Sequence, residues 1–460
     1  MVIRLEESTV VIIVIFHILG VIAAFYALFQ SRTPQGMVAW AIGLVTFPLI
    51  ALPVFLLFGK RRPSGYLEFD VLKEYPINSH DLVKHFENKV DFLTLSEHPY
   101  MAGNDIKLLI DGKTTFHSML QSIDEAKEYV LLQMYIFRTD AVGKKFAEAL
   151  SKKAREGVKV YLLYDNHAIF MKPSVLKELE KAGVKFGSHS PGKRSKFYLN
   201  FRNHRKLLIV DGKVGYWGGV NIGLDYVGAL PEIGYWRDTN VRVTGPAVML
   251  GQTEFAKDWN WSKKDKLDVR WEVAEPTGNT SLIIHNSNPI GPEAMNLLQH
   301  VEMINSAKER IWIANPYVVP PQQIMDALSI AAIKHLDVRV IAPLKSDNDY
   351  VSGAAEMYYE RLLKYGIKVY RYQKGMMHQK VMLIDDKLGI VGSSNLDFRS
   401  MFINFENGII TNDKKFLLEL EAMLKQDFND SIEMALEDYK LQSFYKKFRT
   451  RVLNAFAPIM

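Results

Sequence analysis

The sequence predicts an α/β protein built from two copies of one α/β unit, preceded by two transmembrane helices. Three observations support this prediction. Two uncharged apolar runs lie near the N-terminus, strand-like and helix-like patterns alternate from residue 105 onward, and one polar segment occurs twice. With 460 residues, 48% hydrophobic and 23% charged, the chain is long enough for two globular domains.

The two apolar runs cover residues 9–29 and 37–58, and neither contains a charged residue. Each is as long as the roughly 20 residues that a helix needs to cross a bilayer. The first run is long for a signal peptide, and a second run follows at once. Because only residues 30–36 separate them, we expect a transmembrane hairpin within residues 1–60.

Basic residues flank these runs unevenly. Lys60, Arg61 and Arg62 follow the second run, whereas the short loop between the runs contains only Arg32. The positive-inside rule then predicts that both chain ends, and the large part after the hairpin, lie in the cytoplasm. We therefore expect a multi-pass membrane protein with its catalytic part on the cytoplasmic side.

After a mixed segment over 61–104, expected to be a membrane-proximal linker, the first α/β unit covers residues 105–275. Its expected elements are a strand at 106–110, a helix at 116–126, a strand at 129–137, a helix at 143–155 and a strand at 158–164. Apolar runs that end at turn residues justify the strands, and longer amphipathic stretches justify the helices.

The second unit, residues 276–460, repeats this order. Residues 307–313 resemble 126–132, and residues 338–341 resemble 158–162. We therefore expect two copies of one unit to meet and form a single site, so that neither copy works alone.

One polar segment occurs in both units with the same spacing. A histidine precedes a lysine by two residues, an aspartate by seven and an asparagine by seventeen. These residues are His204, Lys206, Asp211 and Asn221 in the first copy, and His378, Lys380, Asp385 and Asn395 in the second. Residues two apart on a strand share a face, so each histidine and lysine can address one ligand together.

The residue types favour chemistry on a phosphodiester. One neutral imidazole can attack phosphorus and form a phosphohistidine, while the other protonates the leaving oxygen and then activates the incoming alcohol. Lys206 and Lys380, helped by Asn221 and Asn395, would hold the non-bridging oxygens. This scheme needs no metal and no cofactor. Because the motif is symmetric, the residues alone do not identify the nucleophile.

The paired segments resemble the phospholipase D superfamily, and their surroundings resemble its bacterial cardiolipin synthase branch. The matching strings are Asn203-His204-Arg205-Lys206 and residues 218–223, 235–239, 395–400 and 404–406. The resemblance covers essentially the whole chain. It implies two pseudo-symmetric α/β sandwich domains with the active site between them, in a protein of the bacterial inner membrane.

The resemblance also implies individual roles. His204 would be the nucleophile and His378 the acid and base. An acidic residue is expected behind each histidine to orient the ring, and the matching positions downstream of the two motifs are Asp238 and Glu406.

Two positions depart from the superfamily pattern: Gly219 stands where serine is usual, and Asp386 where glycine is usual. Neither change removes a reacting atom, so both halves are expected to be active. The motif aspartates Asp211 and Asp385 have two possible roles, one in the chemistry and one as structural groups at the strand end.

The branch resemblance implies transfer between two phosphatidylglycerol molecules, which gives cardiolipin and glycerol. Hydrolysis to phosphatidic acid would result instead if water replaces the alcohol. The sequence also allows a membrane-tethered nuclease, favoured only by the net charge of +6, and a non-enzymatic lipid-binding scaffold. No nucleic acid partner is expected under the main hypothesis.

The C-terminal tail, residues 444–453, alternates cations with aromatic and apolar residues. It predicts either a basic amphipathic helix on an anionic membrane surface or a helix packed on the domain with solvated lysines.

Overall fold

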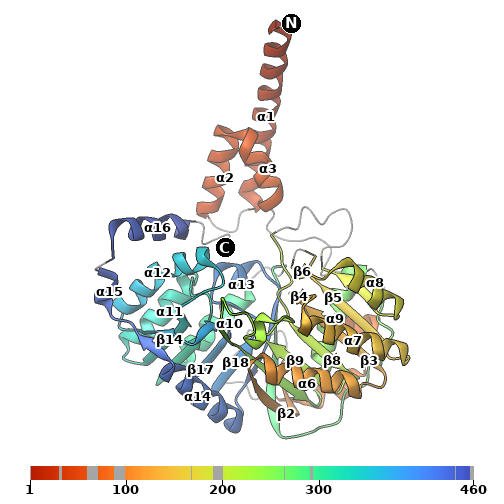
Figure 1. Cartoon of the computed structure of the whole chain (residues 1–460). Coiled ribbons are helices and arrows are strands. Elements are labelled where there is room, and N and C mark those ends of the chain that lie inside the picture. The colour runs from red at the N-terminus through yellow and green to blue at the C-terminus, as the bar shows by residue number, and fades with distance from the viewer. Residues whose placement is uncertain are drawn as a thin grey trace.

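The computed structural model describes residues 2–30, 34–59, 71–87, 99–166, 168–189, 200–263, 265–290, 294–440 and 442–455. The protein has a group of apolar N-terminal helices that projects from a large α/β body (Figure 1).

A single 16-stranded sheet runs through both halves of the α/β body. The first half contributes β1 (Phe86–Glu87), β2 (Tyr100–Ile110), β3 (Tyr129–Met134), β5 (Lys159–Tyr164), β7 (Lys185–Ser188), β8 (Leu207–Val210), β9 (Val214–Gly218) and β11 (Thr239–Thr244). The second half contributes β12 (Thr280–Ser287), β13 (Arg310–Ala314), β14 (Asp337–Pro343), β15 (Lys368–Tyr372), β17 (Val381–Ile384), β18 (Leu388–Gly392), β19 (Glu406–Thr411) and β20 (Ser431–Glu433).

The strand order shows the duplication. It reads β7-β5-β3-β8-β9-β11-β2 in one half and β15-β14-β13-β17-β18-β19-β12 in the other, with β2 and β12 paired antiparallel at the junction. Each half thus repeats the same arrangement about the junction. The predicted α/β class and the duplicated architecture are confirmed.

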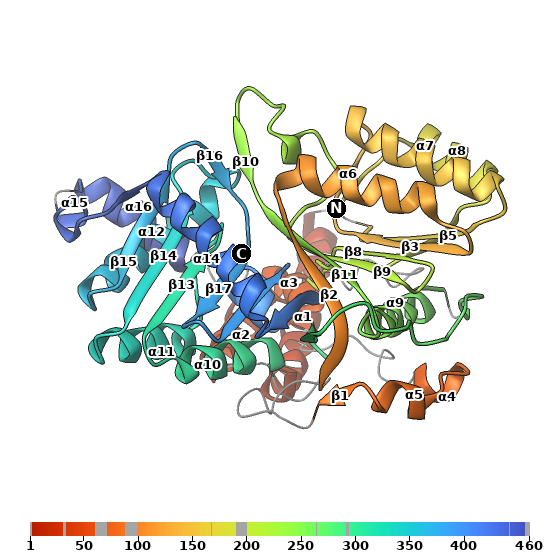
Figure 2. The same ribbon diagram turned by 90° about the horizontal axis from the view of Figure 1, so that it is seen from below.

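Helices cover both faces of the sheet in each half (Figure 2). In the first half these are α6 (Asp111–Glu125), α7 (Ala141–Arg155) and α8 (Pro173–Lys181) on one face and α9 (Val248–Lys263) on the other. In the second half they are α10 (Met295–Ser306), α11 (Gln322–Ile333) and α12 (Asp349–Lys364) on one face and α14 (Lys414–Asn429) on the other.

Covering both faces explains why the central strands read as continuous apolar runs. Along β3, Val130 and Leu132 pack with α6 to α8, whereas Leu131 packs with α9. One buried cluster contains Val241 of the first half and Ile409 of the second, so the halves share a core.

At the N-terminus, the structure forms α1 (Val2–Gln30), α2 (Pro34–Thr46) and α3 (Pro48–Phe58). Among the described residues, only α1 is long and apolar enough to cross a membrane, over Ser8–Phe29. The structure therefore does not confirm the second spanning helix expected over 37–58, because this run forms two shorter helices. The chain leaves the helical conformation at Phe47, with φ −129° and ψ 56°, because the ring of Pro48 disfavours a helical residue before it.

Helices α2 and α3 are about 20 Å and about 16 Å long at 1.5 Å per residue, too short for a hydrocarbon core of about 30 Å. They lie as a short hairpin beside the C-terminal part of α1 (Figure 1). Its tip reaches Gly20, where an added Cβ would overlap the carbonyl oxygen of Leu44 and approach Pro48. The tip of the hairpin therefore reaches only the middle of the apolar part of α1.

The segment expected as a linker over 61–104 is described only in part, since residues 60–70 and 88–98 lie outside the described residues. Its described part contains α4 (Val71–Glu74) and α5 (Ser79–Val83). Between them Tyr75 stacks on Trp271 with ring centroids 4.0 Å apart, which fixes this part against the first half. Strand β2 begins at Tyr100, before the expected end of the linker.

Candidate active site

The two motif histidines lie three residues before β8 and β17, the equivalent strands of the two halves. Both side chains belong to buried residues, with His204 8% and His378 5% exposed. His204 and Lys206 lie close enough to His378 to affect its ionisation electrostatically. The duplicated motifs therefore form one site at the junction of the halves.

Backbone pairing between the halves places each histidine. The amide of His204 donates to the carbonyl of Phe405 at 2.9 Å. Similarly, the amide of His378 donates to the carbonyl of Arg237 at 2.7 Å, where β10 (Tyr235–Arg237) pairs in parallel with β16 (Gly375–Met377). Each histidine is thus held by the segment that precedes the acidic residue of the opposite half.

The acidic partners cross between the halves. Nδ1 of His204 lies 2.9 Å and 3.1 Å from the two carboxylate oxygens of Glu406, and Nδ1 of His378 lies 2.7 Å from a carboxylate oxygen of Asp238. The acidic residue expected behind each histidine is present, but each comes from the other copy. Because a carboxylate holds the proton on Nδ1, Nε2 is the ring atom that can act on a substrate.

Three side chains support Glu406 besides His204. Ser393 donates from Oγ at 2.5 Å, Ser400 from Oγ at 2.8 Å and Asn404 from Nδ2 at 3.2 Å. Burial raises the pKa of Glu406, but His204 and its other partners outweigh burial and hold the pKa below its usual value. The sequence assigned no role to these three residues, although all of them lie in or beside strings that resemble the family.

Asp238 has a different environment. Its carboxylate accepts the amide of Thr239 at 2.8 Å, and burial raises the pKa of Asp238 to about 6. Gly219 occupies the position equivalent to Ser393, and a Cβ there would overlap a carboxylate oxygen of Asp238. Glycine therefore replaces the usual serine at position 219 for a steric reason. The replacement makes the two acid–histidine pairs unequal, because only Glu406 receives a hydrogen bond from a serine at this position.

The two motif lysines are buried beside the histidines. Nζ of Lys206 donates to the carbonyl of His204 at 2.6 Å, and Nζ of Lys380 donates to the carbonyl of His378 at 2.5 Å. Burial lowers the pKa of Lys206 to about 7 and that of Lys380 to about 8. Within the described part of the chain neither lysine forms an ion pair with a carboxylate, so each can hold an anion.

Burial also acts on the histidines. It lowers the pKa of His204 to about 4 and that of His378 well below its usual value. Both imidazoles are therefore neutral near pH 7 before substrate binds, as a nucleophile requires. A bound phosphodiester anion would favour the protonated form of a neighbouring imidazole, which an acid requires.

The motif aspartates bond to backbone rather than to the histidines. Asp211 accepts the amides of residues 127–129 at 2.8 Å each, and Asp385 accepts those of residues 308–310 at 2.9 to 3.3 Å. These amides lead into β3 and β13, the strands beside β8 and β17. Of the two roles that the sequence allowed for Asp211 and Asp385, these hydrogen bonds favour the structural one.

The two asparagines, both expected to help hold phosphate, lie in different environments. The side-chain oxygen of Asn221 accepts the amide of Ile136 at 3.1 Å, and its nitrogen donates to Tyr226 at 2.5 Å, so both ends of the amide are engaged in the first half. Asn395 is buried, and its side-chain oxygen has no hydrogen-bond partner among the described residues.

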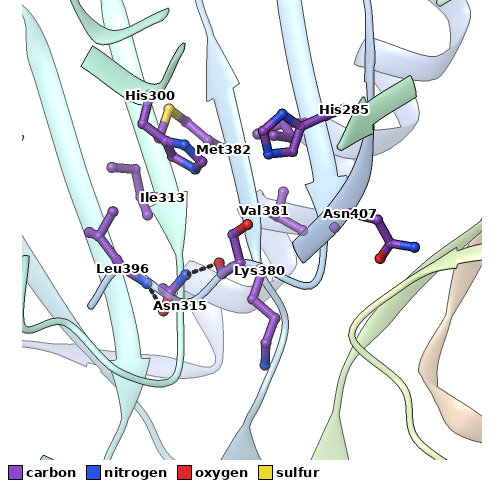
Figure 3. Close-up of a pocket in the computed structure, with 12 residues that line it drawn as sticks. His285, His300, Ile313, Asn315, Lys380, Val381, Met382, Leu396 and Asn407 are labelled. Carbon is purple, nitrogen blue, oxygen red and sulfur yellow. Dashed lines mark hydrogen bonds between the residues drawn. The ribbon is translucent and has the colours of Figure 1, made fainter. Parts of the chain in front are cut away.

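A small cavity lies behind β17, beside the motif residue Lys380. It encloses about 20 Å³, roughly the space that one water molecule needs and far too little for a lipid headgroup. His285 and His300 lie at one end and Lys380 at the other (Figure 3). Nε2 of His285 lies 3.0 Å from Oδ1 of Asn296, and Nδ2 of Asn296 donates to the backbone carbonyl of Ser400 at 2.6 Å.

Comparison with known proteins gives consistent matches. A family model described as cardiolipin synthase, PLD-like domain, matches residues 119–259 and 300–428. Cardiolipin synthase A of Pseudomonas putida (strain W619) is 35% identical over 96% of this chain and 97% of its own length. The protein of the same description from Pseudomonas aeruginosa (strain LESB58) is 35% identical over 96% of this chain and 94% of its own length.

Among solved structures, the phosphatidylserine synthase of Haemophilus influenzae Rd KW20 has a similar fold. It matches with a TM-score of 0.61 over 80% of this chain and 98% of its own, at 13% identity. This likeness supports the fold, while the sequence matches over nearly the full length identify the family. The chain belongs to the cardiolipin synthase family of phospholipase D-like enzymes.

Proposed function

We propose that the protein transfers the phosphatidyl group of one phosphatidylglycerol to the glycerol hydroxyl of a second, forming cardiolipin and releasing glycerol. The observation that carries the proposal is the pair of buried histidines, each held at Nδ1 by an acid of the opposite half and each beside a buried lysine. In a chain of this family, that arrangement suits an anionic phosphodiester.

The first step breaks the bond between phosphorus and the headgroup oxygen. Nε2 of His204 attacks phosphorus, and a phosphatidyl–histidine bond forms. His378, which takes up a proton when the anionic substrate binds, gives that proton to the departing glycerol. Lys206 and Lys380 stabilise the charge that builds on the non-bridging oxygens.

In the second step a new phosphatidylglycerol enters with its free hydroxyl towards phosphorus. His378 accepts the hydroxyl proton, the alkoxide oxygen bonds to phosphorus, and the bond to His204 breaks. Cardiolipin leaves, and His378 holds a proton for the next cycle. His204 is the better nucleophile of the two, because its partner Glu406 has a lowered pKa and is held in the carboxylate form.

We also propose that the catalytic halves lie on the cytoplasmic face of the membrane that α1 crosses. If the hairpin of α2 and α3 enters and leaves the membrane on the same side, Arg32 and Lys60-Arg61-Arg62 lie on the side of the catalytic halves. The opposite side then has only Arg4, near the N-terminus. The positive-inside rule favours the cytoplasm for the more basic side. The N-terminus would then lie on the opposite side.

The experiment is product analysis by mass spectrometry. Purified full-length protein is incubated with phosphatidylglycerol in uncharged detergent micelles with a chelator. Cardiolipin and glycerol released in equal amounts support the proposal. Phosphatidic acid as the sole lipid product would make the enzyme a hydrolase, and cleavage of DNA without lipid turnover would favour a membrane-tethered nuclease.

A further inference from the structure

The last helix, α16 (Phe444–Ala455), packs against α12, but most of its large apolar side chains do not face α12. Its inward side includes Thr450, which is buried, and Leu453, which packs against the core of the second half at Gly353. The large apolar side chains point outward instead. They are Phe444 (84% exposed), Tyr445 (75%), Phe448 (57%) and Val452 (43%).

These outward side chains form a stripe along α16. The rings of Phe444 and Phe448, one turn apart, have centroids separated by 6.4 Å. Arg449, Arg451 and Lys446 are exposed on the same helix, and Nζ of Lys446 also lies 3.6 Å from a carboxylate oxygen of Glu356 on α12. An aromatic stripe flanked by cations is the pattern of a helix that lies at a lipid–water interface. A helix packed on the domain would instead bury its apolar face in the protein.

The position of α16 fits a membrane surface. Figure 1 shows α16 on the side of the α/β body that faces α1 to α3, running across the direction of α1. In Figure 2, turned by 90°, α16 is seen along its side rather than end-on. Its axis therefore lies approximately in the plane of a membrane that α1 crosses. The short helix α13 (Phe398–Phe402), which follows the second motif, lies on the same side (Figure 1).

We propose that α16 docks flat on the anionic bilayer surface, with its aromatic side chains among the lipid headgroups and its cations on lipid phosphates. This contact would hold the second half, with His378 and Lys380, against the surface that supplies the lipid. The occupant is a lipid surface rather than a second copy of the chain, because the interspersed cations suit anionic headgroups and would be costly to bury in a dry protein interface. The benefit of this docking to catalysis rests on the proposed function, whereas the docking itself does not.

The absence of cysteine from the chain allows a direct test by site-specific labelling. The full-length variant F448C carries an environment-sensitive fluorophore, and L418C is the matched control. Leu418 is 66% exposed on α14, on the side of the body away from α1 to α3 (Figure 1). Both proteins are reconstituted in nanodiscs of phosphatidylcholine with or without phosphatidylserine, which is anionic but is not the proposed substrate.

We expect the probe at 448 to shift to shorter wavelength and to be quenched by a lipid-borne quencher near the headgroups, while the probe at 418 does neither. The shift should be larger with phosphatidylserine and should weaken in high salt. Equal emission at 448 and 418 in all lipids would overturn the proposal. So would a shift at 448 in uncharged detergent that grows with protein concentration, which would indicate a second copy as the partner.

A second test measures turnover. The double variant F444S/F448S should lose about tenfold in turnover of phosphatidylglycerol in nanodiscs, the scale expected when two aromatic side chains no longer leave water. Its turnover of a short-chain phosphatidylglycerol dissolved in detergent should match the wild type, and L418S should match it in both. Equal loss in nanodiscs and detergent would mean a folding or catalytic defect and would overturn the docking role. The fluorescence test needs no turnover, so it stands or falls separately from the proposed function.

Discussion

At the scale of residues, the active site depends on an exchange of acids between the two copies. Glu406 of the second half orients His204 of the first, and Asp238 of the first half orients His378 of the second. The pairs are unequal because Ser393 donates to Glu406, whereas its counterpart Gly219 leaves room for Asp238 and offers no side-chain donor. This inequality gives a physical reason for assigning different roles to two histidines in equivalent motifs.

The first prediction concerns the nucleophile. His204→Ala should lower turnover by at least about 10³-fold and should form no covalent phosphatidyl-enzyme, because the attacking nitrogen is lost. His378→Ala should also be nearly inactive but should still bind phosphatidylglycerol. Intact-mass spectrometry after an alkaline quench measures the adduct. An adduct on the His204→Ala protein would reverse the two roles.

The second prediction is a bell-shaped dependence of kcat/KM on pH. Burial lowers the pKa of Lys206 to about 7 and of Lys380 to about 8, so their charge, present at lower pH, is lost as pH rises through these values. Burial raises the pKa of Asp238 to about 6, so the carboxylate that orients His378 is lost as pH falls below this value. Activity should therefore be highest between these limits.

Steady-state assays in uncharged micelles across this range would measure both limbs. Lys206→Arg keeps a positive charge at high pH and should move the basic limb upward if Lys206 causes it. A flat profile through the neutral region would contradict the assignment.

At the scale of elements, the motif aspartates connect neighbouring strands. Asp211 at the end of β8 accepts three amides that lead into β3, and Asp385 does the same between β17 and β13. Both residues have positive φ, 52° and 50°, in the tight turn that follows each strand. The repeated spacing therefore contains a structural requirement as well as a chemical one.

The third prediction tests this structural role. Asp211→Ala and Asp385→Ala should each lower the free energy of unfolding by about 2–4 kcal/mol, because buried amides lose their acceptor. Asp386→Ala, a change in the neighbouring exposed residue, should have a much smaller effect. Thermal unfolding in detergent measures the difference. Loss of turnover with an unchanged melting temperature would instead indicate that these aspartates take part in catalysis.

At the scale of the whole molecule, the two halves form one structure. They share the sheet through β2 and β12, and buried Arg205 of the first half donates to the carbonyls of Glu406 and Ser287 in the second. A half expressed alone would lack both an acidic partner and a sheet neighbour. Nearby, α2 and α3 form a hairpin whose tip reaches only the middle of α1.

The fourth prediction concerns membrane topology. Because α2 and α3 are each too short to span the bilayer, the N-terminus and the catalytic halves should lie on opposite sides. In spheroplasts, protease added outside should remove an N-terminal tag and leave a C-terminal tag intact. Protection of both tags would support the two-span hairpin expected from the sequence, and a lysed sample provides the control for protease access.

The sequence by itself determined the α/β class, the duplication and the family, because the periodic apolar pattern and the repeated spacing of histidine and lysine are local properties of the chain. It also identified Asp238 and Glu406 as the acidic candidates. Only the tertiary structure decided that these acids cross between halves, that Asp211 and Asp385 hold strands together, and that the second apolar run breaks at Pro48. His378 and Asp238 are 140 residues apart and His204 and Glu406 are 202 residues apart, so their pairing depends on how distant segments pack. The same is true of the space beside Gly219 that Asp238 occupies.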